Sequence, residues 1–490
     1  MILHRHACAF CVLLLAAACN SPQNQPHTET AAAVSEKPNI IFILADDLGY
    51  GDLSSFGQTR FDTPNIDRLA AEGMTFTQHY SGSTVCAPSR SALMTGQHTG
   101  HTFIRGNKEV RPEGQHPLPD SVFTLPEMLK QQGYHTGAFG KWGLGFPGSE
   151  GDPNRQGFDR FVGYNCQRLA HHYYPRYLWD NQQQITFEEN AGFGKGRYAP
   201  DYIHERTLAF LDDHAEDPFF LFIASPIPHA ELIAPDSVMD RYRGKYLPEK
   251  VYQGTDDGER YRQGPYESQA ESHAAFVAMV DVLDRQVGDI LDKLEALGID
   301  DKTLVIFSSD NGPHQEGGAD PDYFDSNGPL RGYKRDLYEG GIRVPTLARW
   351  PGTIQAGSTS DHVSAFWDLM PTLADLTGAT APDDIDGISY LPTLLGTGTQ
   401  AQHDYLYWEF HERGGRIAFR QGKWKAVKYN YLEAPDAPFE LYDLEADLGE
   451  TTNLAGENPD VLATFEALRE QARTESEVFS FGSKGYLQGQ

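Results

Sequence analysis

The chain has little cysteine, an excess of acidic over basic residues, and almost no long apolar stretches. Three of its five cysteines, Cys8, Cys11 and Cys19, lie in the first 19 positions. Cys86 and Cys166 remain, too few for a disulfide framework. Lys and Arg number 40 against 69 Asp and Glu, and the net charge is −29. A general nucleic-acid binder is excluded because such proteins present a basic face. Any site for an anion must therefore be a local basic pocket.

The N-terminus has the pattern of an export signal. Arg5 precedes an apolar run from Ala7 to Ala18, which is shorter than the roughly 20 residues that a membrane span needs. The run ends in Leu15-Ala16-Ala17-Ala18-Cys19, which resembles a bacterial lipobox with Cys19 as the lipidated residue; an ordinary signal-peptidase cut is the alternative. We expect a signal peptide at 1–18, a lipid-anchored polar tether at 19–37, and a location in the periplasm or at the outer membrane of a bacterium.

The body of the chain alternates apolar strands with helices. Continuous apolar runs at 39–44, 219–223 and 304–307 are typical of buried parallel strands. Helices are expected at 64–73, 124–133, 200–214 and 267–297. This order predicts an α/β domain over 38–395 with a doubly wound, mostly parallel sheet. Four short alternating strands between 405 and 443, followed by a helix at 460–472, predict a small antiparallel α+β subdomain over 396–490.

Polar side chains with metal-binding or catalytic chemistry follow these strands. They are Asp46, Asp47, Lys141, His229, Asp310 and Asn311. Open α/β sheets bind ligands beyond the carboxyl ends of their strands, so we expect these residues along one edge. Hard oxygen ligands of this kind suit Ca²⁺ or Mg²⁺ better than zinc. Each residue alone has an ordinary structural explanation, such as a turn or a helix cap, and only the joint placement indicates a site.

The run Cys86-Ala87-Pro88-Ser89-Arg90, with Thr95-Gly96 downstream, resembles the signature of type I, formylglycine-dependent sulfatases of the alkaline-phosphatase-like superfamily. Stretches at 39–49, 140–142, 310–313 and 332–345 resemble the same family in the same order, and 441–454 resembles its C-terminal subdomain. The similarity therefore covers about residues 38–455. It implies the alkaline-phosphatase-like fold and hydrolysis of sulfate monoesters.

The resemblance also implies a set of residue roles. A dedicated maturase would convert Cys86 to Cα-formylglycine, whose hydrate has one hydroxyl to attack sulfur and a second through which sulfate is expelled. Asp46, Asp47, Asp310 and Asn311 would hold Ca²⁺, or less typically Mg²⁺, together with residue 86. Arg90 would hold the aldehyde hydrate, Lys141 and Lys334 would neutralise sulfate oxygens, and His229 would protonate the leaving oxygen.

One position departs from the family pattern. Many members have His after Gly-Lys-Trp, whereas this chain has Gly143, which cannot act in the elimination step. His171 is our candidate for a substitute, with a substrate contact as the alternative. Nearby, Tyr173, Tyr174, Tyr177 and Trp179 are expected either to stack on a sugar ring or to belong to the core.

Export favours an extracellular sulfated carbohydrate as the substrate and partner, with no nucleic acid. Two other functions stay open on the sequence. One is a phosphate mono- or diester hydrolase of the same superfamily, although such enzymes commonly use Thr or Ser and two zinc ions. The other is a calcium-dependent glycan-binding lipoprotein without turnover.

Overall fold

A computed structural model of the protein describes residues 37–111 and 113–481. The predicted signal peptide and the tether up to residue 36 lie outside the described residues. Within the described part, the main feature is a ten-stranded sheet in the order β11-β2-β10-β9-β1-β8-β4-β5-β6-β7. Its centre consists of four parallel strands: β9 (Thr303–Ser309), β1 (Asn39–Ala45), β8 (Phe219–Ala224) and β4 (His135–Lys141). The predicted mostly parallel α/β architecture is confirmed.

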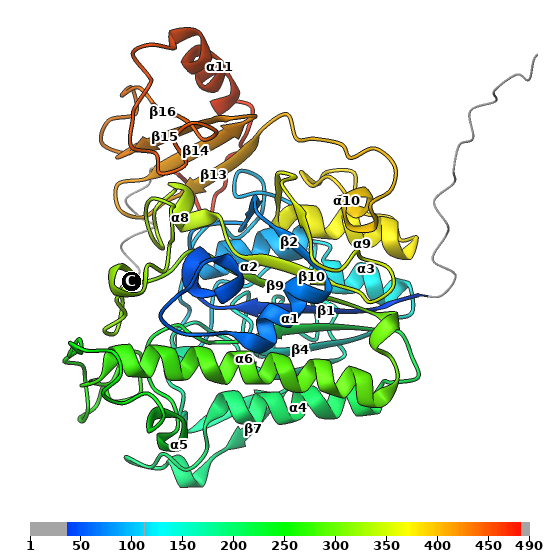
Figure 1. The fold of residues 1–490 in the computed structure, drawn as a ribbon, viewed down its shortest axis with the longest axis vertical. Helices are drawn as coiled ribbons and strands as arrows, with labels where there is room; N and C mark the ends of the chain where they lie inside the picture. Colours follow the sequence, from blue (N-terminus) through cyan, green and yellow to red (C-terminus); the bar gives the residue numbers. More distant parts are fainter. Residues whose placement is uncertain (1–36, 112, 482–490) are drawn as a thin grey trace, which may run out of the picture. The chain divides into compact units, whose positions relative to one another are not determined.

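Helices cover both faces of this sheet. Alternate residues of β1 point to opposite faces, and because residues 40–45 are all apolar, both faces must be buried. Ile41 and Ile43 lie in one buried cluster with residues of α1 (Pro64–Glu72), α4 (Ala199–Asp213) and α6 (Ser272–Leu297). Ile40, Phe42 and Leu44 lie in a second cluster with residues of α2 (Cys86–Thr95), α3 (Leu125–Gln131) and α9 (Leu369–Thr377). Figure 1 shows α4 and α6 on one side of the sheet and α2, α3 and α9 on the other.

The outer strands of the sheet differ from the expectation because they lack continuous apolar runs. At one edge, β10 (Thr346–Arg349) is antiparallel to β9 and to β2 (Met74–Phe76), and β11 (Ser358–Ser360) follows. At the other edge, β5 (Arg160–Tyr164) is parallel to β4, whereas β6 (Tyr177–Asp180) and β7 (Gln183–Thr186) are antiparallel. The helix expected from 267 begins at Ser272, since Gln269 forms an antiparallel bridge with Tyr252.

The C-terminal part contains the predicted antiparallel sheet. It consists of β13 (Leu406–Phe410), β14 (Arg416–Gln421), β15 (Trp424–Tyr429) and β16 (Glu440–Asp443), followed by α11 (Pro459–Arg469). Buried polar contacts join it to the larger sheet domain. Lys425 Nζ lies 2.7 Å from Glu339 Oε1 at the start of α8 (Glu339–Ile342), and Trp408 Nε1 donates to the carbonyl of Ser81 at 3.0 Å. The domain boundary at 395/396 stays a prediction.

The remaining elements are short. They are β3 (His79–Tyr80), β12 (Ser364–Ala365), α5 (Asp236–Met239), α7 (Pro321–Phe324) and α10 (Leu391–Leu395). Among the residues described by the structure, no helix combines the length and apolar character needed to cross a bilayer.

Candidate active site

The candidate site lies at the carboxyl ends of the four central parallel strands. Asp46 and Asp47 follow β1, Lys141 ends β4, His229 comes five residues after β8, and Asp310 follows β9. Because neighbouring parallel strands end at the same edge of a sheet, their loops converge there. All five side chains are buried. The fold therefore brings together the residues that the sequence placed after separate strands.

A group of buried carboxylates forms the floor of the site. The backbone N–H of Asp47 donates to Asp310 Oδ1 at 3.1 Å, and Asn311 Nδ2 donates to Asp47 Oδ1 at 2.7 Å. Arg90, one turn past Cys86 on α2, donates from Nε and Nη2 to Asp310 Oδ2 at 3.2 and 2.8 Å. Asp47 has a φ of 66°, a left-handed conformation that Asp tolerates better than most residues. This turn directs the Asp47 carboxylate toward the group.

Cys86 is the first residue of α2 and lies between the carboxylate of Asp46 and the ammonium group of Lys141. Its Sγ is 3.3 Å from Asp46 Oδ1 and 3.3 Å from Lys141 Nζ. Burial, followed by the charges of Asp310 and Asp46, raises the pKa of the thiol well above its ordinary value. Because the thiolate is the nucleophilic form of cysteine, the unmodified side chain is a poor nucleophile here.

Two buried lysines and a histidine complete the site. Lys141 Nζ donates to Asp46 Oδ2 at 2.6 Å, and Lys334 Nζ donates to Asp47 Oδ2 at 2.7 Å and to His229 Nε2 at 3.0 Å. The other nitrogen of His229, Nδ1, lies 2.5 Å from the carbonyl oxygen of Ala230. A carbonyl only accepts, so Nδ1 carries the proton and Nε2 offers a lone pair to Lys334. Burial, then the charges of Lys334 and Lys141, lowers the pKa of His229 well below its usual value.

The donor set fits a hard divalent cation. One ligand atom each from Asp46, Asp47, Cys86 and His229 lie within 4.8 Å of one another. Asn311 Oδ1 is buried and has no hydrogen-bond partner in the protein, so it is available as a ligand. Beside one histidine and the Cys86 sulfur, the set consists of carboxylate and amide oxygens, which Ca²⁺ and Mg²⁺ prefer and zinc does not.

Comparison with known proteins agrees with this arrangement. The model of the family described as Sulfatase matches residues 38–379. A second model, described as N-sulphoglucosamine sulphohydrolase, C-terminal, matches residues 332–477. The chain belongs to the sulfatase family.

The relatives of this sulfatase span most of its length. Arylsulfatase A of Homo sapiens is 34% identical, with 94% of this chain and 92% of that protein covered. An N-acetylgalactosamine-6-O-sulfatase of Bacteroides thetaiotaomicron is 28% identical, with 90% and 94% covered. The crystal structure of Ps i-CgsB in complex with k-i-k-neocarrahexaose has a TM-score of 0.75 at 27% identity, covering 92% and 96%. The protein is thus a sulfuric ester hydrolase that acts on sulfate monoesters, as the sequence predicted.

A cavity of about 580 Å³ opens at the candidate site of this sulfatase, with Cys86, Gln167, His171, His229 and Lys334 in its lining. His171 stacks on His229 with ring centroids 5.1 Å apart, and His314 stacks on the opposite face at 5.5 Å. Burial lowers the pKa of His171 to about 3, so its ring is neutral. The structure therefore brings His171 to the site beside His229, where it is a weak base.

Gln167 occupies the space beside Gly143, and the sequence analysis did not identify it. The ladder between β4 and β5 continues past both strands, with the N–H of Gly143 donating to the carbonyl of Asn165 at 3.1 Å. A Cβ atom at Gly143 would lie 2.4 Å from Gln167 Nε2, and the φ of Gly143 is +84°. Both polar atoms of the Gln167 side chain are buried without a protein partner. A buried amide with neither atom satisfied is rare, and it marks a group available to a ligand.

The aromatic residues separate into two groups. Tyr173 and Tyr174 belong to the core, which is the second of the two expectations above. The Tyr173 hydroxyl donates to the carbonyl of His229 at 2.8 Å and so supports the histidine loop. Tyr177 and Trp179 donate to the two oxygens of Glu113, each at 2.6 Å.

Cys166 is buried, and burial raises the pKa of its thiol to about 12, as expected for an inert cysteine.

Proposed function

We propose that this sulfatase removes sulfate from a sulfated carbohydrate, with residue 86 matured to formylglycine and with Ca²⁺ held by Asp46, Asp47, Asp310 and Asn311. The observation that carries the proposal is the position of Cys86, buried beside Lys141 and lining the same cavity as Lys334. Once in place, the hydrated aldehyde supplies the nucleophile and the cation offsets the carboxylate charge. The unmodified thiol is a poor nucleophile at this position, and unlike the aldehyde hydrate it has no second hydroxyl through which sulfate could be expelled.

The protein's own residues bind and orient the sulfate group. Hydrogen bonds to Asp46 and Asp47 hold the ammonium groups of Lys141 and Lys334 at the site. From there the two ammonium groups neutralise sulfate oxygens. Arg90 fixes Asp310 and keeps positive charge under residue 86. These cations stand in a low-dielectric environment, where they stabilise developing negative charge more strongly than in water.

His229 is our candidate for the proton donor to the leaving oxygen. Its Nε2 faces Lys334, whereas Nδ1 is held by the Ala230 carbonyl. Without an anion, burial and then the charges of the neighbouring lysines lower the pKa of His229 and keep the imidazole neutral. A bound sulfate adds negative charge and partly cancels those lysines, which raises the pKa of the ring. Protonation at Nε2 is then favoured when substrate is present, and this is the atom that would give up the proton.

Gln167 and His171 are proposed as substrate contacts. The Gln167 amide can donate to a sulfuryl or sugar oxygen from the place where many relatives have a histidine. An amide has no basic nitrogen, so Gln167 can bind and orient but cannot take a proton. His171 contributes a neutral ring that lines the cavity beside His229.

A carbohydrate substrate is supported by the polar and charged residues that line the cavity and by two relatives, one named N-acetylgalactosamine-6-O-sulfatase and one solved in complex with k-i-k-neocarrahexaose. The test is a panel of defined sulfated mono- and oligosaccharides, with an aryl phosphate in parallel, measured as inorganic ion release by matured enzyme. Mass spectrometry of the peptide containing residue 86 reports the modification. Phosphate release without sulfate release, or full activity of a Cys86→Ala variant, would overturn the proposal.

We also propose that the chain is exported and anchored through Cys19, on the basis of the N-terminal sequence alone. Its maturase would then act before the chain folds, because residue 86 is buried in the folded protein. Metabolic labelling with a fatty acid in the native host should label the full-length chain. A Cys19→Ala variant should lose the label and move from the membrane fraction to the soluble fraction, whereas an unlabelled native chain would contradict the anchor.

A further inference from the structure

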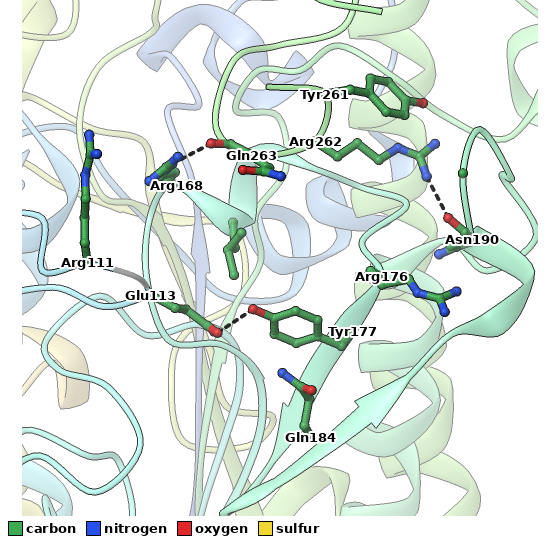
Figure 2. Close-up of a pocket in the computed structure, with 12 residues that line it drawn as sticks. Arg111, Glu113, Arg168, Arg176, Tyr177, Gln184, Asn190, Tyr261, Arg262 and Gln263 are labelled. Atoms are coloured by element: carbon green, nitrogen blue, oxygen red, sulfur yellow. Dashed lines mark hydrogen bonds between the residues drawn. The ribbon is translucent and has the colours of Figure 1, made fainter. Parts of the chain in front are cut away.

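A second cavity of about 1010 Å³ adjoins the catalytic one, and the two share Arg111, Arg168 and Gln263 in their linings. Binding sites for drug-sized ligands usually measure about 300–1,000 Å³. The second cavity is therefore large enough for more than the one sugar that carries the reacting sulfate. It lies against the β6–β7 hairpin at the edge of the large sheet (Figure 2).

The second cavity is lined mostly by polar and charged residue types. Amides from Gln184, Asn190 and Gln263 and the rings of Tyr177 and Tyr261 line it, and Leu169 is the one aliphatic side chain among the lining residues. Amides and tyrosine hydroxyls hydrogen-bond to hydroxyl groups, and tyrosine rings offer flat apolar faces. This combination is suited to sugar units rather than to an apolar ligand.

Most arginines that line the second cavity are paired with carboxylates. Three arginines of the second cavity are neutralised: Arg168 by Glu109 at 2.7 Å, Arg176 by Glu188 at 2.8 Å, and Arg262 by Glu267 at 3.1 Å.

Arg111 is exposed and has no carboxylate partner within residues 37–111 and 113–481, and Figure 2 shows it at one side of the cavity without a dashed contact. In a chain with a net charge of −29, an unneutralised arginine beside the active site is a local attraction for an anion.

Glu113 is the acidic residue in the lining of the second cavity. Its oxygens accept hydrogen bonds from Tyr177 and Trp179, which fix the loop that carries Arg111 against β6. Its negative charge disfavours an anion deep in the cavity. An anionic group is therefore best accommodated near Arg111, with neutral hydroxyls beyond it.

We infer that the second cavity binds the sugar next to the one that is desulfated, and that Arg111 contacts a sulfate ester or carboxylate on that neighbour. This inference rests on the proposed action on a sulfated carbohydrate and adds that the substrate is an oligosaccharide with a second anionic group. Arginine suits both anions because its planar guanidinium presents two parallel donors.

The test uses three disaccharides with the same sulfated residue and a neutral, a sulfated or a uronic acid neighbour. For the matured enzyme, kcat/KM should be about five- to tenfold higher with either anionic neighbour, mostly through KM. Arg111→Gln should remove this preference, and Arg111→Lys should keep part of it. Arg206→Gln is the matched control, because Arg206 is exposed on α4 and lines neither cavity; it should keep the full preference.

Binding to a Cys86→Ala protein provides a readout independent of turnover. Its affinity for the anionic disaccharides should show the same preference and the same loss with Arg111→Gln. A preference that is absent, or that survives Arg111→Gln in both assays, overturns the inference. Failure of sulfate release from every saccharide would overturn the proposed function instead, and the binding assay would still decide the role of Arg111.

Discussion

Replacing Gln167 with methionine separates a functional role of this side chain from a structural one. Met has nearly the same length as Gln and fills the same space beside Gly143, so packing is largely retained. Neither polar atom of Gln167 has a protein partner, and a buried unsatisfied polar group costs about 1–3 kcal/mol. The free energy of unfolding should therefore stay unchanged or rise by about 1 kcal/mol.

The kcat/KM of the Gln167→Met variant should fall. A hydrogen bond to a charged group such as a sulfate ester contributes about 1.5–3 kcal/mol, which corresponds to a loss of about 10- to 100-fold in kcat/KM. The measurements are urea unfolding and sulfate release from the same saccharide, with residue 86 checked for equal maturation in both proteins. A gain in stability together with a loss of rate is the expected signature of a group positioned for ligand rather than for folding.

Gln156 provides the matched control. It is also buried, with 1% of its surface exposed against 7% for Gln167, but its Nε2 donates to the Glu150 carbonyl at 2.9 Å. Gln156→Met should therefore lower the free energy of unfolding by about 1–2 kcal/mol and leave kcat/KM of the folded enzyme unchanged. If Gln167→Met behaves like the control, with reduced stability and normal kcat/KM, then Gln167 is a structural residue and our reasoning is wrong.

Three further predictions follow from buried charges and the cation site. Lys425→Met leaves the carboxylate of Glu339 buried without its ammonium partner at 2.7 Å, so urea unfolding should show a loss of about 3–5 kcal/mol; an unchanged midpoint would contradict this. Burial raises the pKa of Asp52 to about 7, so the folded protein keeps a proton that the unfolded chain releases near pH 4, and stability falls as pH rises from about 4 to 7. Asp52→Asn should abolish that loss, at most about 4 kcal/mol, and an equal effect at pH 5 and pH 8 would refute it. Chelation of divalent ions should lower both sulfate release and the melting temperature, with Ca²⁺ restoring both; unchanged values would argue against a cation at Asp46 and Asp47.

Local sequence patterns predicted the centre of the fold and most of the residues that the structure gathers at the candidate site, whose catalytic roles stay predictions. β1, β8 and β9 are buried on both faces, so their sequences are continuous apolar runs. Such runs predict buried strands from the sequence alone. The residues at their carboxyl ends, including Asp46 and Asp310, could be placed on one edge because parallel strands share it. The outer strands β5, β6, β7 and β10 gave no comparable signal, since they are short and of mixed polarity.

The sequence by itself predicted the reaction class through its resemblance to sulfatases, because the Cys86-to-Arg90 run and the other motifs that carry this resemblance are short contiguous segments. Tertiary structure decided what surrounds them. Gln167 meets Gly143 only because β5 pairs with β4, and Arg111 stands at the junction of two cavities only because Glu113 is tied to β6 by Tyr177 and Trp179. Such contacts depend on strand pairing and loop packing between segments that are far apart in the sequence. The residue pattern within one segment therefore cannot predict them.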